Sequence, residues 1–151
     1  MIARSVRRGL GAALVATAFA VACRRSPSPE LAPAAFRGAT AGADWTLVEI
    51  AGGPAATGAG GRPATLRFDA DSARVTGFAG CNRYFARYTL DGTALRFESP
   101  AMTRMACAEG SALEQQLAAA LEATRRYELA GDRLTLVGDA GPTARFTRRA
   151  P

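Results

Sequence analysis

The chain contains no histidine and no lysine among its 151 residues. The absence of histidine excludes Ser-His-Asp and Cys-His catalytic arrangements and removes the commonest ligand from any metal site. The three cysteines do not cluster, so they cannot replace that ligand. Acidic residues are scattered singly, apart from Asp69 and Asp71, which gives no support to a paired-carboxylate hydrolase. We therefore expect no enzymatic activity, no metal and no cofactor.

The positive charge of the chain comes from arginine alone. All 19 basic residues are arginine, and the net charge is +6. Residues 44–148 contain 12 arginines and 12 acidic residues, so this part is neutral and the excess positive charge lies outside it. A nucleic-acid-binding domain needs clustered positive charge on its folded part. We therefore expect no nucleic-acid partner, and the length indicates a single domain.

Residues 1–23 have the pattern of an export signal. Three arginines precede an apolar run at residues 9–22, which is too short to span a bilayer comfortably. The run ends in Ala-Val-Ala followed by Cys23, which resembles a bacterial lipoprotein box, although Ala20 stands where leucine is usual. We expect Cys23 to be lipidated and to anchor the protein in the cell envelope, facing the periplasm, with the outer membrane favoured. The alternative is ordinary signal cleavage and secretion.

Residues 24–43 are rich in proline, alanine and arginine and show no sustained periodicity. Proline disfavours helix interiors and central strands, so we predict a flexible tether here. Lipidation of Cys23 would leave two cysteines, an even number that suits an oxidising compartment.

Residues 44–148 are predicted to form a mainly β (α+β) domain of about eight short antiparallel strands and one helix. Short alternating runs between turn residues indicate strands at residues 45–50, 65–69, 73–76, 83–90, 94–98, 127–130, 133–137 and 143–148. So many short strands predict a curved sheet that approaches barrel closure. Its interior is expected to be filled by Leu66, Phe68, Tyr88, Leu95, Phe97, Leu134 and Leu136.

Residues 108–124 change to a helical period. Leu113, Leu117 and Leu121 recur every four residues, which predicts one narrow apolar stripe on a helix. Ser111 and Glu114 fit a capping box at the start of this helix. We expect the helix to cover the open side or one end of the sheet.

Two motifs stand out, and we expect them to meet in the fold. Residues 77–84 read Gly-Phe-Ala-Gly-Cys-Asn-Arg-Tyr, and residues 102–107 read Met-Thr-Arg-Met-Ala-Cys. Gly77 and Gly80 predict a bulge or tight bend, because glycine adopts positive φ without steric cost. Asn82 suits the exit from that bend, since its side chain can bond nearby backbone.

Cys81 and Cys107 are separated by 26 positions and have three interpretations. A structural disulfide is favoured over two buried reduced thiols. A redox-active pair has the least support, because the chain has no Cys-x-x-Cys and no lysine or histidine to lower the pKa of a thiol.

Arg83 and Arg104 are the charged members of the two motifs, and two roles remain open for them. They could form a surface patch that grips an anion or a carboxylate partner. The alternative, which we favour from sequence, is that they make local ion pairs while Asn82 fixes the turn.

The order of these motifs resembles the META domain family, which includes the heat-shock protein HslJ. The resemblance covers residues 44–148 and implies a small β-rich, barrel-like fold with one helix. It also implies an envelope location, often as a lipoprotein, and links to stress tolerance; no enzymatic activity is established for the family. The motif residues that carry it, besides the two cysteines, are Gly77, Gly80, Asn82, Arg83, Tyr84, Thr103, Arg104 and Met105.

These observations together predict a non-catalytic envelope lipoprotein domain of META/HslJ type. We expect it to be a monomer that binds or supports an envelope protein partner in stress tolerance. The alternative is a carrier of a small hydrophobic ligand that uses the barrel interior. An interior filled by the domain's own side chains favours the first, and an enzyme ranks third.

Overall fold

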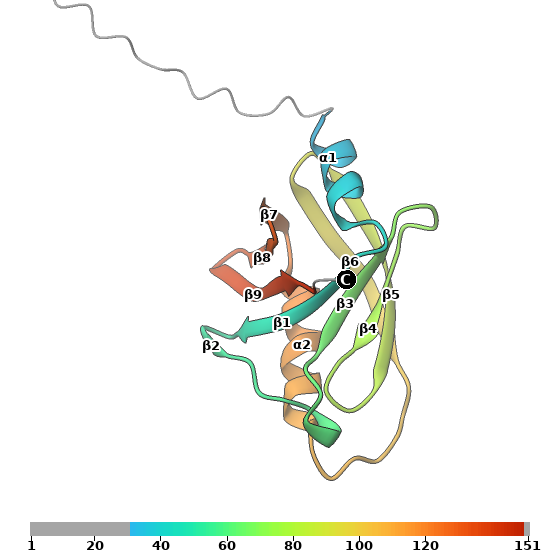
Figure 1. Cartoon of the computed structure of the whole chain (residues 1–151), viewed down its shortest axis with the longest axis vertical. Coiled ribbons are helices and arrows are strands. Elements are labelled where there is room, and N and C mark those ends of the chain that lie inside the picture. The colour runs from blue at the N-terminus through green and yellow to red at the C-terminus, as the bar shows by residue number, and fades with distance from the viewer. Residues whose placement is uncertain (1–30, 150–151) are drawn as a thin grey trace, which may run out of the picture.

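The computed structural model describes residues 31–149, which form nine strands, two α-helices and one 3-10 turn (Figure 1). The predicted signal, Cys23 and residues 24–30 lie outside the described residues. The elements in chain order are α1 (Leu31–Thr40), β1 (Asp44–Ile50), β2 (Gly53–Pro54), η1 (Ala59–Gly61), β3 (Thr65–Asp69), β4 (Arg74–Phe78), β5 (Arg83–Asp91), β6 (Ala94–Met102), α2 (Ser111–Ala123), β7 (Arg126–Ala130), β8 (Arg133–Gly138) and β9 (Gly141–Arg148).

All nine strands belong to one antiparallel sheet that closes on itself. The strand order is β2-β1-β3-β4-β5-β6-β7-β8-β9, and β1 also pairs with β9 through partners such as Leu47 and Phe146. This confirms the expected curved, mainly β fold, with the two-residue β2 as an addition. The weakest join is between β6 and β7, which share the single pair Ala94 and Arg126. Helix α2 packs against strands on both sides of this join, β6 on one side and β8 and β9 on the other, and also contacts β1.

The interior of the sheet is filled by side chains. Strand alternation places one face of each strand inside, and this pattern follows from the two-residue period of extended backbone. All seven side chains that were predicted to fill the interior are buried, and the most exposed of them is 8% accessible: Leu66, Phe68, Tyr88, Leu95, Phe97, Leu134 and Leu136. Trp45 on β1 is also fully buried.

The tether prediction is wrong for residues 31–43, because helix α1 packs on the sheet. Phe36 is fully buried, and its ring centroid lies 4.9 Å from that of Phe68 and 4.4 Å from that of Tyr127. Pro33 is the third residue of α1, where a missing N–H costs nothing because the first turn has no intrahelical acceptor. Four of the ten residues of α1 are alanine, the best helix former, and burial of the Phe36 ring fixes this helix on the sheet. Figure 1 shows α1 at one end of the sheet.

Helix α2 buries the predicted stripe, namely Leu113, Leu117, Ala120 and Leu121. The capping-box prediction is wrong, however. The N-cap residue is Gly110, with φ +88° and no side-chain cap, so Ser111 is the first helical residue instead of the cap. The side chain of Glu114 is therefore free to bond elsewhere.

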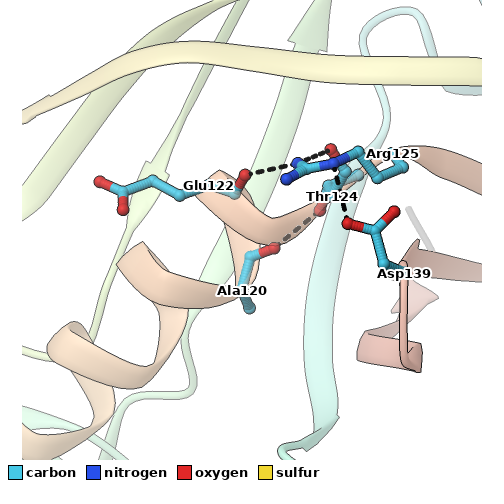
Figure 2. Close-up of polar contacts among 5 residues, drawn as sticks. All are labelled: Ala120, Glu122, Thr124, Arg125 and Asp139. Atoms are coloured by element: carbon cyan, nitrogen blue, oxygen red, sulfur yellow. Dashed lines mark hydrogen bonds and ion pairs between the residues drawn. The ribbon is translucent and has the colours of Figure 1, made fainter.

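The C-terminus of α2 is closed by side chains (Figure 2). The hydroxyl of Thr124 donates to the carbonyl of Ala120 at 2.7 Å, and Nη1 of Arg125 donates to the carbonyl of Glu122 at 2.9 Å. Nε of Arg125 also lies 3.4 Å from a carboxylate oxygen of Asp139 in the β8–β9 turn. The Arg125 guanidinium satisfies a carbonyl that has no partner within the helix, and its positive charge complements the helix dipole. Its ion pair with Asp139 links this end of α2 to the sheet.

Candidate functional site

The two sequence motifs meet beside the N-terminus of α2. Cys81 and Cys107 form a disulfide, with their Cα atoms 5.9 Å apart. Cys81 is buried, and Cys107 is partly exposed. This geometry fits the structural-disulfide interpretation, and it ties the β4–β5 turn to the loop at residues 103–110.

Asn82 holds the same two segments together with hydrogen bonds. Its side chain is buried, and Oδ1 accepts from the hydroxyl of Thr103 at 2.8 Å and from the backbone N–H of Met105 at 2.7 Å. Nδ2 donates to the Met105 carbonyl at 3.4 Å. The backbone N–H of Asn82 donates to Oε2 of Glu114 at 2.8 Å. Asn82 thus does more than end a bend, because it joins the turn to both the loop and α2; we call this set the Asn82 clamp.

The two motif glycines have different roles. Gly80 has φ +116°, and its carbonyl accepts from the backbone N–H of Ala59 at 2.6 Å. A Cβ added at Gly110 would lie 2.1 Å from the same carbonyl oxygen, so three segments of backbone approach closely here. Gly77 lies within β4, where an added Cβ would sit 2.0 Å from the carbonyl oxygen of Thr65. The predicted bend therefore lies at Gly80, whereas Gly77 is required by close approach.

The remaining motif residues divide between core and surface. Tyr84 is buried and donates its hydroxyl to the Thr65 carbonyl at 3.1 Å, and burial raises the pKa of Tyr84. Arg83 and Arg104 are exposed, and the side chain of Met105 is 60% accessible. The motifs thus build a rigid support whose charged members face solvent.

A groove of about 720 Å³ lies on the outer face of β3, β4 and β5, beside the Asn82 clamp. Thr103 belongs to both features, and its hydroxyl accepts from the backbone N–H of Arg83, another lining residue, at 3.2 Å, so the clamp supports one wall of the groove. We call it the arginine groove; its lining residues are Asp44, Arg62, Pro63, Thr65, Arg67, Thr76, Gly77, Phe78, Arg83, Tyr84, Phe85, Thr103 and Arg149.

Cross-strand pairing sets the positions of the groove side chains. The guanidinium of Arg62 lies 4.0 Å above the ring of Phe78, and Phe78 pairs with Arg83 across β4 and β5. Arg62 therefore stacks on this ring, while Arg83 lies opposite Phe78 on the neighbouring strand. In the neighbouring row, Arg67 pairs with Thr76, and Thr76 pairs with Phe85. Phe85 is 59% exposed, which is unusual for so large an apolar side chain.

The charges of the groove are largely uncompensated. Asp44 is its one acidic lining residue, and it pairs with Arg67 at 3.1 Å. Within residues 31–149, Arg62, Arg83 and Arg149 have no carboxylate within ion-pair distance. The four arginines and one aspartate give the groove a formal charge of +3. This differs from the local ion pairs that we expected for Arg83.

The opposite half of the sheet provides the contrast. Four arginines there each pair with a carboxylate: Arg125 with Asp139, Arg126 with Glu128, Arg145 with Glu49, and Arg148 with Asp132. Arginines without an ion pair also lie elsewhere within residues 31–149, namely Arg37, Arg74, Arg87, Arg96 and Arg133. The groove differs because three such arginines, Arg62, Arg83 and Arg149, line one recess. Arg104 likewise has no ion pair within the described part of the chain.

Residues 31–149 also lack two kinds of feature. No helix in this part of the chain is long and apolar enough to cross a membrane. Across the same residues, no three metal-binding side chains of the His, Cys, Asp or Glu type lie together.

The closed antiparallel sheet, its packed helix and the disulfide-linked motifs define a small, mainly β fold with a groove on its outer surface. A META domain model matches residues 39–151, and the chain belongs to the META domain family. This confirms the resemblance, and the match begins inside α1. No curated protein matches the chain significantly.

Two solved structures share the fold. An NMR structure of a protein from Burkholderia xenovorans is 28% identical, with a TM-score of 0.64, and the match covers 90% of this chain and 100% of that one. A second NMR structure is 24% identical, with a TM-score of 0.55, over 70% of this chain and 87% of that one. The second likeness concerns the fold alone.

Several groove residues were missed by sequence reasoning. Phe85 has the outward parity of the predicted strand at residues 83–90, opposite to the inward Tyr88, but Arg62, Arg67 and Arg149 lie in separate segments. Strand register, the loop before β3 and the segment after β9 bring them to one surface, and these arrangements cannot be read from one sequence. An aromatic residue on an otherwise polar strand face was the available signal.

Proposed function

We propose that this protein is a non-catalytic binding domain of the cell envelope, whose arginine groove is the surface that holds its partner. A single observation carries the proposal: Arg62, Arg83 and Arg149 line one groove without carboxylate partners in residues 31–149. Guanidinium groups that are not paired within a protein are available to bind carboxylates or phosphates of another molecule.

The expected location supports the same proposal. A lipid on Cys23 would hold the domain at the membrane, with the outer membrane favoured, and the Cys81–Cys107 disulfide is suited to an oxidising compartment. The domain would act as a monomer that binds or supports an envelope component, and the family resemblance points to conditions of stress. No nucleic acid, cofactor or reaction is part of the proposal.

The carrier alternative receives less support from the fold. The interior of the sheet holds the buried side chains of Trp45, Phe68, Leu95 and many others, while the groove lies on the outer face. A hydrophobic ligand would have to displace packed core side chains, which is costly.

Site-specific photocrosslinking in the intact envelope tests the binding proposal. A photoreactive residue at Thr76, in the groove, should yield one dominant protein adduct, whereas the same residue at the exposed Arg133 on β8 should not. The adduct should disappear when Arg83 and Arg149 are both replaced by glutamate. Equal labelling from the two positions, or an adduct indifferent to the two arginines, would contradict the proposal.

The location is tested separately. Mass spectrometry of the mature protein should show a lipidated Cys23, and Cys23→Ser should move the protein from the membrane fraction to the soluble envelope fraction. A mature protein in the cytosol would contradict the envelope assignment.

A further inference from the structure

We infer that the arginine groove binds an extended acidic segment of a partner protein, with carboxylates on its arginines and an apolar side chain against Phe85. The inference rests on the proposed function and names the chemistry of the partner. Three features of the groove carry it: its length, the spacing of its cations, and the exposed aromatic ring among them.

The groove is long enough for several residues. Its lining comes from β1, β3, β4 and β5, which are consecutive neighbours in the sheet. At roughly 4.8 Å between strands, three intervals give roughly 14 Å. An extended chain rises about 3.3 Å per residue, so about four residues would cross the groove.

The cations are spread along this length. Arg149 lies at the β1 end, where its backbone N–H donates to the carbonyl of Asp44 at 2.8 Å. Arg83 lies on β5 at the other end, opposite Phe78. A single phosphate or carboxylate would contact only one of these positions, whereas carboxylates on alternate residues of a chain would reach both.

Arg62 is oriented for such a ligand. Its guanidinium stacks on Phe78 at 4.0 Å, and its Nε donates to the carbonyl of Ala59 at 3.4 Å. Stacking reduces the rotational freedom of the side chain and leaves the remaining N–H groups for an acceptor. A guanidinium held in one orientation binds a carboxylate with less loss of entropy.

Phe85 indicates that the ligand is not purely anionic. Its ring is 59% exposed between Thr76 on β4 and Ala101 on β6. Aromatic side chains on a recognition surface commonly contribute much of the binding energy. An acidic segment with an apolar side chain would cover this ring, whereas a uniform polyanion would leave it in water.

Two other occupants fit the groove less well. Residues 1–30 of the chain contain five arginines and one acidic residue, Glu30, so this segment would be repelled by the groove. A lipid surface is flat on this scale and would contact the rim of a recess of about 720 Å³ rather than its lining.

Fluorescence anisotropy with the purified full chain tests the inference. The probe is a fluorescein-labelled peptide of alternating glutamate and leucine. Arg83→Glu combined with Arg149→Glu should weaken binding at least about tenfold, because two charge-assisted contacts become repulsive. Phe85→Ser should weaken it about threefold or more. The matched control Arg133→Glu, an exposed arginine on β8, should change it less than about twofold.

Several results would overturn the inference. One is equal binding of a peptide of alternating lysine and leucine. Others are full competition by inorganic phosphate or by vesicles of anionic phospholipid, which would assign the groove to phosphate. If the glutamate–leucine peptide does not bind but the Thr76 crosslink still depends on Arg83 and Arg149, the inference of an acidic segment is wrong and the proposed binding function stands. Failure of both would overturn the proposed function too. The unfolding midpoint of each exposed-site variant should match that of the wild type, which separates binding from folding.

Discussion

The backbone N–H of Asn82 donates a hydrogen bond to Oε2 of Glu114 over a distance of 2.8 Å. The two residues are 32 positions apart, and the bond joins the β4–β5 turn to the first turn of α2. The side chain of Asn82 holds the intervening loop through Thr103 and Met105. One buried asparagine thus fixes a turn, a loop and a helix beside the arginine groove.

Glu114→Ala should lower the free energy of unfolding by about 1–3 kcal/mol, because it leaves the partly buried N–H of Asn82 without an acceptor. Glu114→Gln keeps an acceptor oxygen and should lose less. Urea denaturation measures the difference, and Glu122→Ala, an exposed glutamate on the same helix, is the control. Equal effects of Glu114→Ala and Glu122→Ala would show that the bond contributes nothing.

The sequence predicted which face of α2 is buried, but not what the side chains at its N-terminus contact. The buried stripe of Leu113, Leu117 and Leu121 follows from helical period alone and was predicted. The spacing of Ser111 and Glu114 also fits a local rule, but Gly110 already begins the helix with a positive φ. Whether Glu114 bonds its own helix or a distant turn depends on what packs beside it, which a local rule does not contain.

The sheet shows the same difference between features set by local sequence and features set by long-range contacts. Alternation predicted that Leu66, Phe68 and Tyr88 point inward, because it follows from the backbone of one strand. The arginine groove depends on pairing between strands, such as Phe78 with Arg83, and on a loop that brings Arg62 over the ring. Segments far apart in the chain build it, so no single window of sequence contains it.

Reduction of the Cys81–Cys107 disulfide should destabilise the domain by about 3.5 kcal/mol at most. The bridge closes a loop across a sequence separation of 26, and the estimate comes from the chain entropy that it removes from the unfolded state. Urea denaturation with and without reductant measures it. The double variant Cys81→Ser and Cys107→Ser should match the reduced wild type and should not respond to reductant. Peptide masses without reductant should contain the crosslinked fragment, and its absence would contradict the disulfide.

Phe36→Ala should lower the free energy of unfolding by about 3–5 kcal/mol, since it removes a fully buried ring that contacts Phe68 and Tyr127. This tests whether α1 belongs to the folded domain. Phe85→Ala is the matched control, because the same side chain is 59% exposed there, and it should cost less than about 1 kcal/mol. Thermal or urea denaturation measures both losses of unfolding free energy. Similar losses from the two variants would show that residues 31–43 are a tether and not part of the folded domain.

Tyr84→Phe should destabilise the domain at neutral pH but not at high pH. Near pH 7 the loss of the hydrogen bond to the Thr65 carbonyl should cost about 1 kcal/mol. Burial raises the pKa of Tyr84 in the folded state above its ordinary value of 10.0. Its neutral form therefore stabilises the fold fully below pH 10, and this contribution is lost as the pH rises further and the unfolded chain ionises.

The phenylalanine variant has no such loss, so its deficit relative to the wild type should shrink between pH 10 and pH 11.5. Tyr88 and Tyr127 also have raised pKa values, but both proteins contain them, so their contributions cancel in the difference. The chain has no lysine, and arginine stays protonated, which leaves the tyrosines as the main titrating groups in this range. Urea denaturation of both proteins from pH 7 to pH 11.5 measures the deficit. A deficit that stays constant across this range would show that Tyr84 ionises as easily in the folded domain as in the unfolded chain.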